Sequence, residues 1–125
     1  MHAPDSLASL RAVLPTLTKA ELTQIVQDLD DRTAEALLYD WPLWARDEQL
    51  PPPGDWFCWL ILAGRGWGKA RTGAEYIRWR VEQCGARRVA LIAQPAADVR
   101  DVIVEGESGI LAVHPPHTRP KYEPS

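Results

Sequence analysis

The sequence predicts an α/β fold, a three-layer arrangement with parallel strands that is preceded by short N-terminal helices. Residues 56–63 are almost continuously apolar, as strands buried on both faces of a parallel sheet usually are. A glycine-rich turn and a helix-forming segment follow over residues 64–84, and residues 88–93 form a second apolar run. The order strand, helix, strand predicts a right-handed crossover between two parallel strands.

Residues 1–40 are expected to form a separate helical segment. Leu7, Leu10 and Leu14 recur at helical spacing until Pro15 ends the pattern. Thr18 and Glu21 have the spacing of a capping box, which starts a second helix. That helix carries one apolar stripe, made of Leu22, Ile25, Val26 and Leu29. A third helix is expected over residues 32–38. The stripe fits packing on the same chain or docking of a partner.

Residues 40–55 are expected to be a connector without helix, because prolines follow Trp41 and occupy residues 51–53. Trp44, Arg46 and Gln49 lie between these prolines. One interpretation is a purine site, in which rings stack on the base and the Gln49 amide reads the adenine edge. The other is that the tryptophans cover the edge of the sheet.

The next segment has the strand, loop and helix layout of a phosphate-binding loop. Its residues are Ala63-Gly64-Arg65-Gly66-Trp67-Gly68-Lys69-Ala70-Arg71. Glycines let several backbone N–H groups point at one spot, and the helix that follows adds its positive N-terminal end. Lys69 can reach the terminal phosphates. The alternative is an ordinary glycine-rich turn before a helix.

Two positions depart from the usual pattern G-x-x-x-x-G-K-[ST]. Ala63 replaces the first glycine, a mild change because Gly64 and Gly66 still supply the turn. Ala70 replaces the hydroxyl residue that normally holds Mg²⁺. Thr72 lies two residues further along the helix, so its side chain points roughly 200° away. The sequence therefore predicts ATP binding with an impaired Mg²⁺ site and no other metal site.

The remaining elements follow the same logic. A helix is expected over residues 69–84, with Ala74, Ile77 and Val81 turned inward and Gly85 as its stop. After the second strand, helices are expected over residues 98–104 and 108–113, the last with Ser108 as N-cap. The tail from His114 is rich in proline and charge and is expected to be irregular.

Charge is unevenly distributed along the 125 residues. Residues 1–59 carry ten acidic and four basic side chains, whereas residues 60–90 carry seven basic and two acidic ones. The basic block coincides with the loop and its helix. It is compatible with binding of a polyanion there or with a solvated helix face. Cys58 and Cys84 suit buried or neutral thiols in a reducing compartment. Neither an export signal nor a membrane span is evident, so a cytoplasmic protein is expected.

Residues 38–125 resemble the large subunit of phage DNA-packaging terminases and of related gene-transfer-agent proteins. The core of the resemblance is Leu62-Ala63-Gly64-Arg65-Gly66-Trp67-Gly68-Lys69, followed by Arg71-Thr72-Gly73-Ala74-Glu75. The flanks Arg46-Asp47-Glu48-Gln49 and Ala96-Ala97-Asp98-Val99-Arg100-Asp101-Val102 fit the same family, as does Glu105-Gly106-Glu107-Ser108-Gly109.

The resemblance implies an ATP-driven motor of the additional-strand, helicase-like P-loop class, with residues 41–125 as the front part of its ATPase domain. The family pumps double-stranded DNA into a capsid through a portal protein, with a small terminase subunit and as a homo-oligomeric ring in a bacterial host. Carried over by position, residues 63–71 would hold the phosphates. Lys69 and Arg65 would act on them as catalytic residues, and Gln49 would read adenine.

The chain also departs from this family. The acidic strand that holds Mg²⁺ and the nuclease domain are missing, so the chain corresponds to a truncated frame, a prophage remnant or a fragment. A nucleotide-binding or interaction module without hydrolysis is therefore a second hypothesis, and a small-molecule kinase a third. Strands without neighbours leave unpaired edges, so marginal stability or self-association is predicted.

Overall fold

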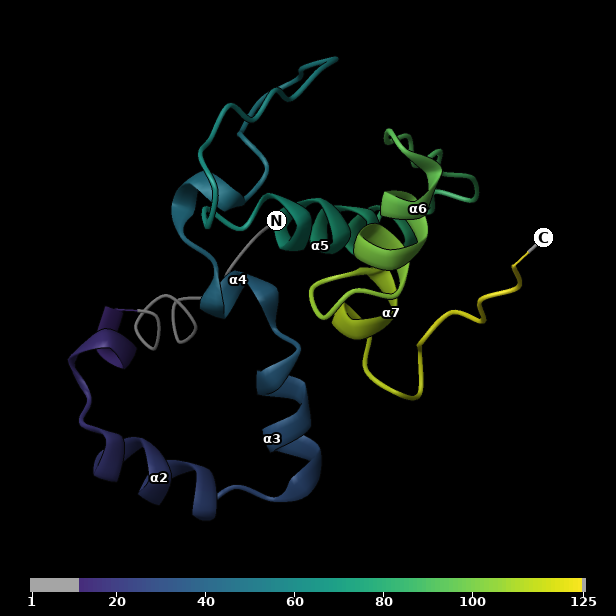
Figure 1. Ribbon diagram of the computed structural model, residues 1–125. Helices are drawn as coiled ribbons and strands as arrows, with labels where there is room; N and C mark the ends of the chain where they lie inside the picture. Colours follow the sequence, from purple (N-terminus) through teal and green to yellow (C-terminus); the bar gives the residue numbers. More distant parts are fainter. Residues whose placement is uncertain (1–11, 125) are drawn as a thin grey trace. The chain divides into compact units, whose positions relative to one another are not determined.

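The computed structural model describes residues 12–124 and divides into two compact units, with the boundary between Leu50 and Pro51. Within the described residues the chain forms helices and irregular segments, and no strand is present (Figure 1). The predicted three-layer α/β fold with parallel strands, of the helicase-like class, is therefore wrong. Both apolar runs lie in irregular chain, residues 56–63 ahead of the longest helix and residues 88–93 after it.

Five bounded helical elements are described in the first unit between residues 14 and 50. They are η1 (Leu14–Thr16), α2 (Lys19–Gln27), α3 (Asp31–Leu38), α4 (Trp41–Trp44) and η2 (Asp47–Gln49). The predicted capping box is confirmed, because the Glu21 amide donates to Thr18 Oγ1 at 3.2 Å and the Thr18 amide to Glu21 Oε2 at 3.0 Å. The helix expected over residues 32–38 is confirmed as α3. Leu7 and Leu10 lie outside the described residues.

The apolar stripe of α2 is only partly covered, since Ile25 and Val26 are 43% and 58% exposed whereas Leu22 and Leu29 are half-buried. One expectation for the first unit needs correction. The connector is not free of helix, because α4 begins at Trp41 with Pro42 in its first turn. A proline is tolerated there, since the first turn needs no N–H from that position. The indole of Trp44 then donates to the Leu37 carbonyl at 2.7 Å, which ties α4 to α3.

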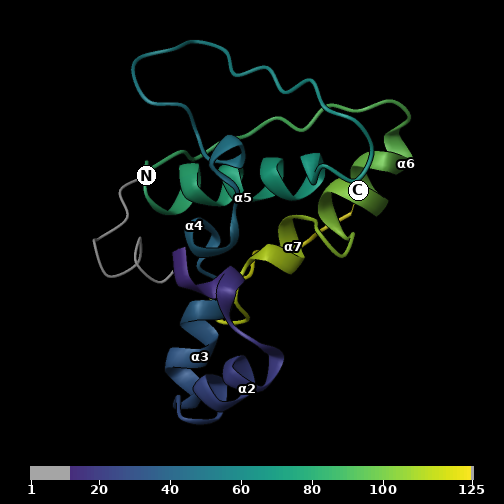
Figure 2. The ribbon, with the colours of Figure 1, turned by 90° about the vertical axis from the view of Figure 1, so that its left-hand side faces the viewer.

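The second unit is organised around α5 (Lys69–Glu82), which packs against η3 (Val99–Val104) and α7 (Ile110–Val113) (Figures 1 and 2). Ala74 and Val113 are buried in this unit, 3% and 1% exposed. Ala74 therefore faces inward as predicted, but Val81 is 45% exposed and does not. Gly85 follows the helix at φ +74°, in the left-handed region that the predicted helix stop requires.

After residue 95 the helix expected over residues 98–104 is present and starts two residues earlier, whereas the one expected over 108–113 begins only at residue 110. The short α6 (Ala96–Asp98) continues directly into η3, a π-helix whose last turn is closed by the Glu105 amide donating to the Arg100 carbonyl at 2.9 Å. The N-cap of α7 is Gly109 and not Ser108. From His114 onward the described chain contains turns and extended segments but no helix, so the irregular tail is confirmed.

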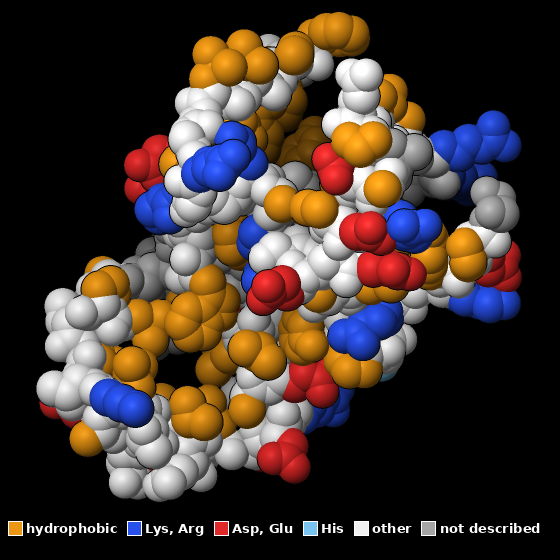
Figure 3. Space-filling view, viewed as in Figure 1, with side chains coloured by type: hydrophobic (Ala, Val, Ile, Leu, Met, Phe, Trp, Pro, Cys, Tyr) orange, Lys and Arg blue, Asp and Glu red, His pale blue; other side chains and the backbone are white. Residues whose placement is uncertain are grey.

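The irregular segment ahead of α5 presents apolar side chains to solvent. Leu60 and Leu62 are 72% and 86% exposed, and Phe57 is fully exposed. Hydrophobic side chains line this segment in the upper part of the space-filling view (Figure 3). Both cysteines are free and exposed, so of the two alternatives, buried or neutral thiols, the first is wrong. The segment contacts α5 through the rings of Trp56 and Trp59, which lie against Tyr76.

Candidate phosphate-binding loop

Two glycines of the loop have backbone conformations that other residues rarely adopt. Gly66 has φ +79° and Gly68 has φ +94°, both in the left-handed region. A Cβ atom on Gly66 would meet no neighbour within 4 Å, so the requirement for glycine there is conformational and not steric. These two positions turn the chain from the extended segment into α5, which is the geometry that the sequence pattern predicts for residues 64–68.

The loop ends at the N-terminus of α5. Lys69 is the first helical residue, Gly68 is its N-cap, and no side chain caps the helix. The Gly68 carbonyl already accepts the Thr72 amide at 2.9 Å, so the helical ladder starts at the loop itself. A 14-residue helix with an N-terminus that no side chain caps offers backbone N–H donors and a partial positive charge to an anion.

The Lys69 side chain folds back across the loop. Its Nζ donates to the Ala63 carbonyl oxygen at 2.6 Å, so the first position of the motif and its lysine lie together. Gly64 and Arg65 are exposed within the loop that this contact closes. One hydrogen bond thus joins the two ends of the segment 63–69.

Arg71, which the sequence pattern places among the phosphate ligands, has its side chain paired with a carboxylate of α5. Its Nε donates to Glu75 Oε1 at 3.0 Å, one turn along α5. The Glu75 side chain is only 2% exposed, and Arg78 lies 3.9 Å from its second oxygen. Burial raises the pKa of the Glu75 carboxyl above its ordinary value, and the charges of Arg71 and Arg78 offset this only in part.

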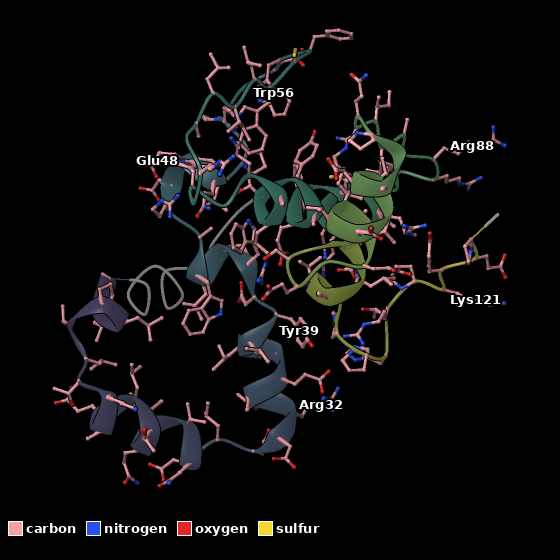
Figure 4. All side chains as sticks on the ribbon, viewed as in Figure 1. Arg32, Tyr39, Glu48, Trp56, Arg88 and Lys121 are labelled. Carbon is pink, nitrogen blue, oxygen red and sulfur yellow. The ribbon has the colours of Figure 1, made fainter. Side chains whose placement is uncertain are left out.

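The same network accounts for part of the basic block. Arg78 Nε donates to Glu82 Oε2 at 3.1 Å, and its terminal nitrogen donates to the Val113 carbonyl at 3.1 Å. Arg78 therefore links α5 to α7. Arg88, by contrast, projects outward from the irregular chain between α5 and α6 (Figure 4).

The residues present do not fit a Mg²⁺ ion at the loop. Ala70 is exposed and supplies a methyl group where the motif supplies a hydroxyl. Thr72 is 1% exposed, and its hydroxyl has no hydrogen-bond partner among the described residues. Over residues 12–124, moreover, no three His, Cys, Asp or Glu side chains are grouped closely enough to hold a metal.

Gln49, the predicted adenine reader, belongs to the first unit and is 6% exposed. Its amide oxygen accepts the Arg46 backbone N–H at 3.0 Å, which closes the turn of η2. The structural role visible for this amide is therefore a local cap. The tryptophans of α4 differ in exposure, since Trp41 is buried and Trp44 is 52% exposed.

An aromatic cluster beside the loop was not predicted. Tyr76 of α5 contacts three tryptophan rings, with centroid distances of 6.3 Å to Trp56, 5.7 Å to Trp59 and 5.8 Å to Trp79. Trp56 is labelled on the segment that precedes the loop (Figure 4). The sequence did contain a pattern that could have indicated the cluster. Trp56 and Trp59 are three residues apart, and so are Tyr76 and Trp79. The cluster fixes the chain that leads into residues 63–69.

Comparisons with protein-family models, curated proteins and solved structures found no match for this chain. Within the described residues no helix has the length and apolar character needed to span a membrane, as the sequence predicts.

Proposed function

We propose that the loop of residues 63–69 and the N-terminus of α5 bind the phosphate tail of ATP. On the sequence resemblance, we further propose that the chain is the ATP-binding segment of a terminase large subunit. The observation that carries the first proposal is the Lys69 ammonium held at the Ala63 carbonyl, across a loop with two left-handed glycines. Backbone donors, a helix N-terminus and a lysine are the groups that grip nucleotide phosphates in such loops.

In this proposal Lys69 exchanges one acceptor for another. Without nucleotide its ammonium donates to a neutral carbonyl, and with nucleotide it would donate to an anionic β- or γ-phosphate oxygen. Charge-assisted hydrogen bonds are roughly twice as strong as neutral ones, so the exchange favours the bound state. Arg65 is exposed in the loop and would add a second cation toward the γ-phosphate.

A nucleotide-binding module without turnover is the second candidate, and Ala70 favours it. The methyl group cannot ligate Mg²⁺, and Thr72 has its hydroxyl buried. Phosphate binding by backbone amides and Lys69 needs no metal, so ATP binding in a chelator fits this candidate. Double-stranded DNA, a portal protein, a small terminase subunit and a homo-oligomeric ring are proposed partners that rest on the sequence resemblance, as does the bacterial cytoplasm as location.

Equilibrium binding of a fluorescent ATP analogue to the full chain tests the proposal, with EDTA present so that no metal contributes. We expect micromolar binding that Lys69→Ala weakens by about tenfold or more, because a charge-assisted contact is lost. Lys121→Ala is the matched control, since it removes one exposed lysine from the tail without touching the loop (Figure 4). Absence of binding, or equal loss in both variants, would contradict the proposal.

A further inference from the structure

The segment from Phe57 to Ala63, called the edge segment below, has a backbone that is largely unpaired, and the one hydrogen bond shown for it is from Lys69 to the Ala63 carbonyl. Within the described part of the chain, no backbone hydrogen bond joins residues 57–62 to any other backbone group. From Cys58 onward its side chains nevertheless alternate in exposure as in a strand, whereas Phe57 is exposed out of phase. Cys58, Leu60 and Leu62 are exposed, whereas Trp59, Ile61 and Ala63 are half-buried. One face is therefore partly buried against its own chain. The other face is exposed, and the backbone groups of residues 57–62 are unpaired within the described chain.

The composition of the edge segment favours pairing with another strand. Residues 57–62 contain no charge, proline or glycine, which are the features that normally protect an exposed edge. Charges stand only at its two flanks, where Asp55 is exposed on one side and Arg65 on the other. These opposite charges lie five residues to either side of Leu60.

We propose that the edge segment pairs antiparallel with the same segment of a second copy, about a twofold axis at Leu60. In this register Asp55 of each copy lies opposite Arg65 of the other, which forms two equivalent ion pairs. Cys58 lies opposite Leu62, so the exposed face of the pair becomes one apolar stripe. Parallel in-register pairing would instead place Asp55 beside Asp55 and Arg65 beside Arg65, which is unfavourable.

Disulfide trapping tests the register directly. In a Cys58→Ser, Cys84→Ser background, Leu60→Cys places two thiols on the axis, where directly opposed strand residues lie within disulfide reach. Leu62→Cys is the matched control, because its two copies would be four residues out of register, about 13 Å apart. We expect oxidation to give a covalent dimer from Leu60→Cys at least tenfold faster than from Leu62→Cys. Equal rates, or no dimer from Leu60→Cys, would overturn the proposal.

Sedimentation of the full chain without nucleotide tests the charges. Asp55→Arg should weaken dimerisation by roughly tenfold, and Asp55→Arg combined with Arg65→Asp should restore it. Leu60→Asp should likewise favour the monomer, whereas Leu38→Asp, at a leucine 62% exposed in the first unit, should not. A chain that is monomeric at every concentration, or a charge exchange that fails to restore the dimer, would overturn the proposal. Because nucleotide is absent, either failure leaves ATP binding untouched.

Discussion

The ammonium of Lys69 lies 2.6 Å from the backbone carbonyl oxygen of Ala63, six residues earlier in the chain. This contact closes the glycine-rich loop on itself. It places the charged side chain of Lys69, the first residue of α5, at the start of the motif. A neutral carbonyl is a weaker partner for an ammonium than a phosphate oxygen. The Lys69 ammonium therefore lies at the loop and donates to a neutral carbonyl, a partner that a phosphate oxygen could replace.

Gly66→Ala should destabilise the chain by about 1–2 kcal/mol, because its φ of +79° places a Cβ in the left-handed region. Gly73→Ala provides the contrast within α5, where a Cβ would meet nothing within 4 Å. That substitution should stabilise the chain by about 1 kcal/mol through helix propensity. Urea unfolding of both variants measures the difference, and equal effects would show that the loop does not need its left-handed turn.

Ala70→Thr should raise the affinity for Mg²⁺-ATP relative to ATP in EDTA, because it restores the hydroxyl that the motif uses for the metal. Ala70→Val has the same branched shape without the hydroxyl and is the matched control. Calorimetric titration with and without Mg²⁺ gives both dissociation constants. If Ala70→Thr leaves the Mg²⁺ dependence unchanged, no metal site forms at this position.

Thr72→Val should increase the free energy of unfolding by about 1 kcal/mol. The Thr72 hydroxyl is buried without a partner among the described residues, and an unsatisfied buried polar group is costly. Valine keeps the branched shape and removes the polar atom. Thr23→Val is the control, because the Thr23 hydroxyl is exposed and donates to the Lys19 carbonyl at 2.8 Å. A loss of stability in Thr72→Val would indicate that the hydroxyl has a partner, such as a buried water.

Glu75 should make stability depend on pH in an unusual direction. Its pKa is raised from 4.5 chiefly by burial, so above that value the folded chain keeps a proton that the unfolded chain releases. Stability contributed by this group therefore falls as pH rises from 4.5 through the raised pKa. Glu75→Gln should remove this component, which urea midpoints across a pH series would reveal as a flatter curve. An unchanged pH dependence would mean that Glu75 is ionised when folded.

The helices were predictable because each satisfies its own backbone hydrogen bonds within a short stretch of sequence. Thr18 and Glu21 start α2 as a capping box, and Lys69 opens α5 directly after the glycines. A strand instead needs a partner from elsewhere in the chain, and composition does not say whether that partner is present. Residues 56–63 keep most of the two-residue alternation of a strand in their exposure yet pair with nothing in the described chain.

The candidate site was predictable to the same extent. The turn ahead of α5 was predictable, because left-handed glycines and a helix that starts at Lys69 follow from local chain geometry. The partner of Arg71 was not foreseen, because Glu75 one turn later competes with any phosphate for that guanidinium. The proline after Trp41 led to the wrong prediction of a connector without helix. A proline in the first turn is compatible with a helix, and α4 forms there. The ring contacts of Tyr76 depend on how the preceding segment folds onto α5, which spacing alone does not fix.

The most direct measurement is the amide NMR spectrum of the ¹⁵N-labelled chain during titration with inorganic triphosphate in EDTA. We expect the amide resonances of Gly64, Gly66, Gly68 and Lys69 to shift together and to saturate, and Lys69→Ala to weaken the response about tenfold or more. Adenosine, which lacks phosphates, should leave these resonances in place. If triphosphate leaves them unmoved, or if adenosine shifts them equally, the loop is not a phosphate-binding site.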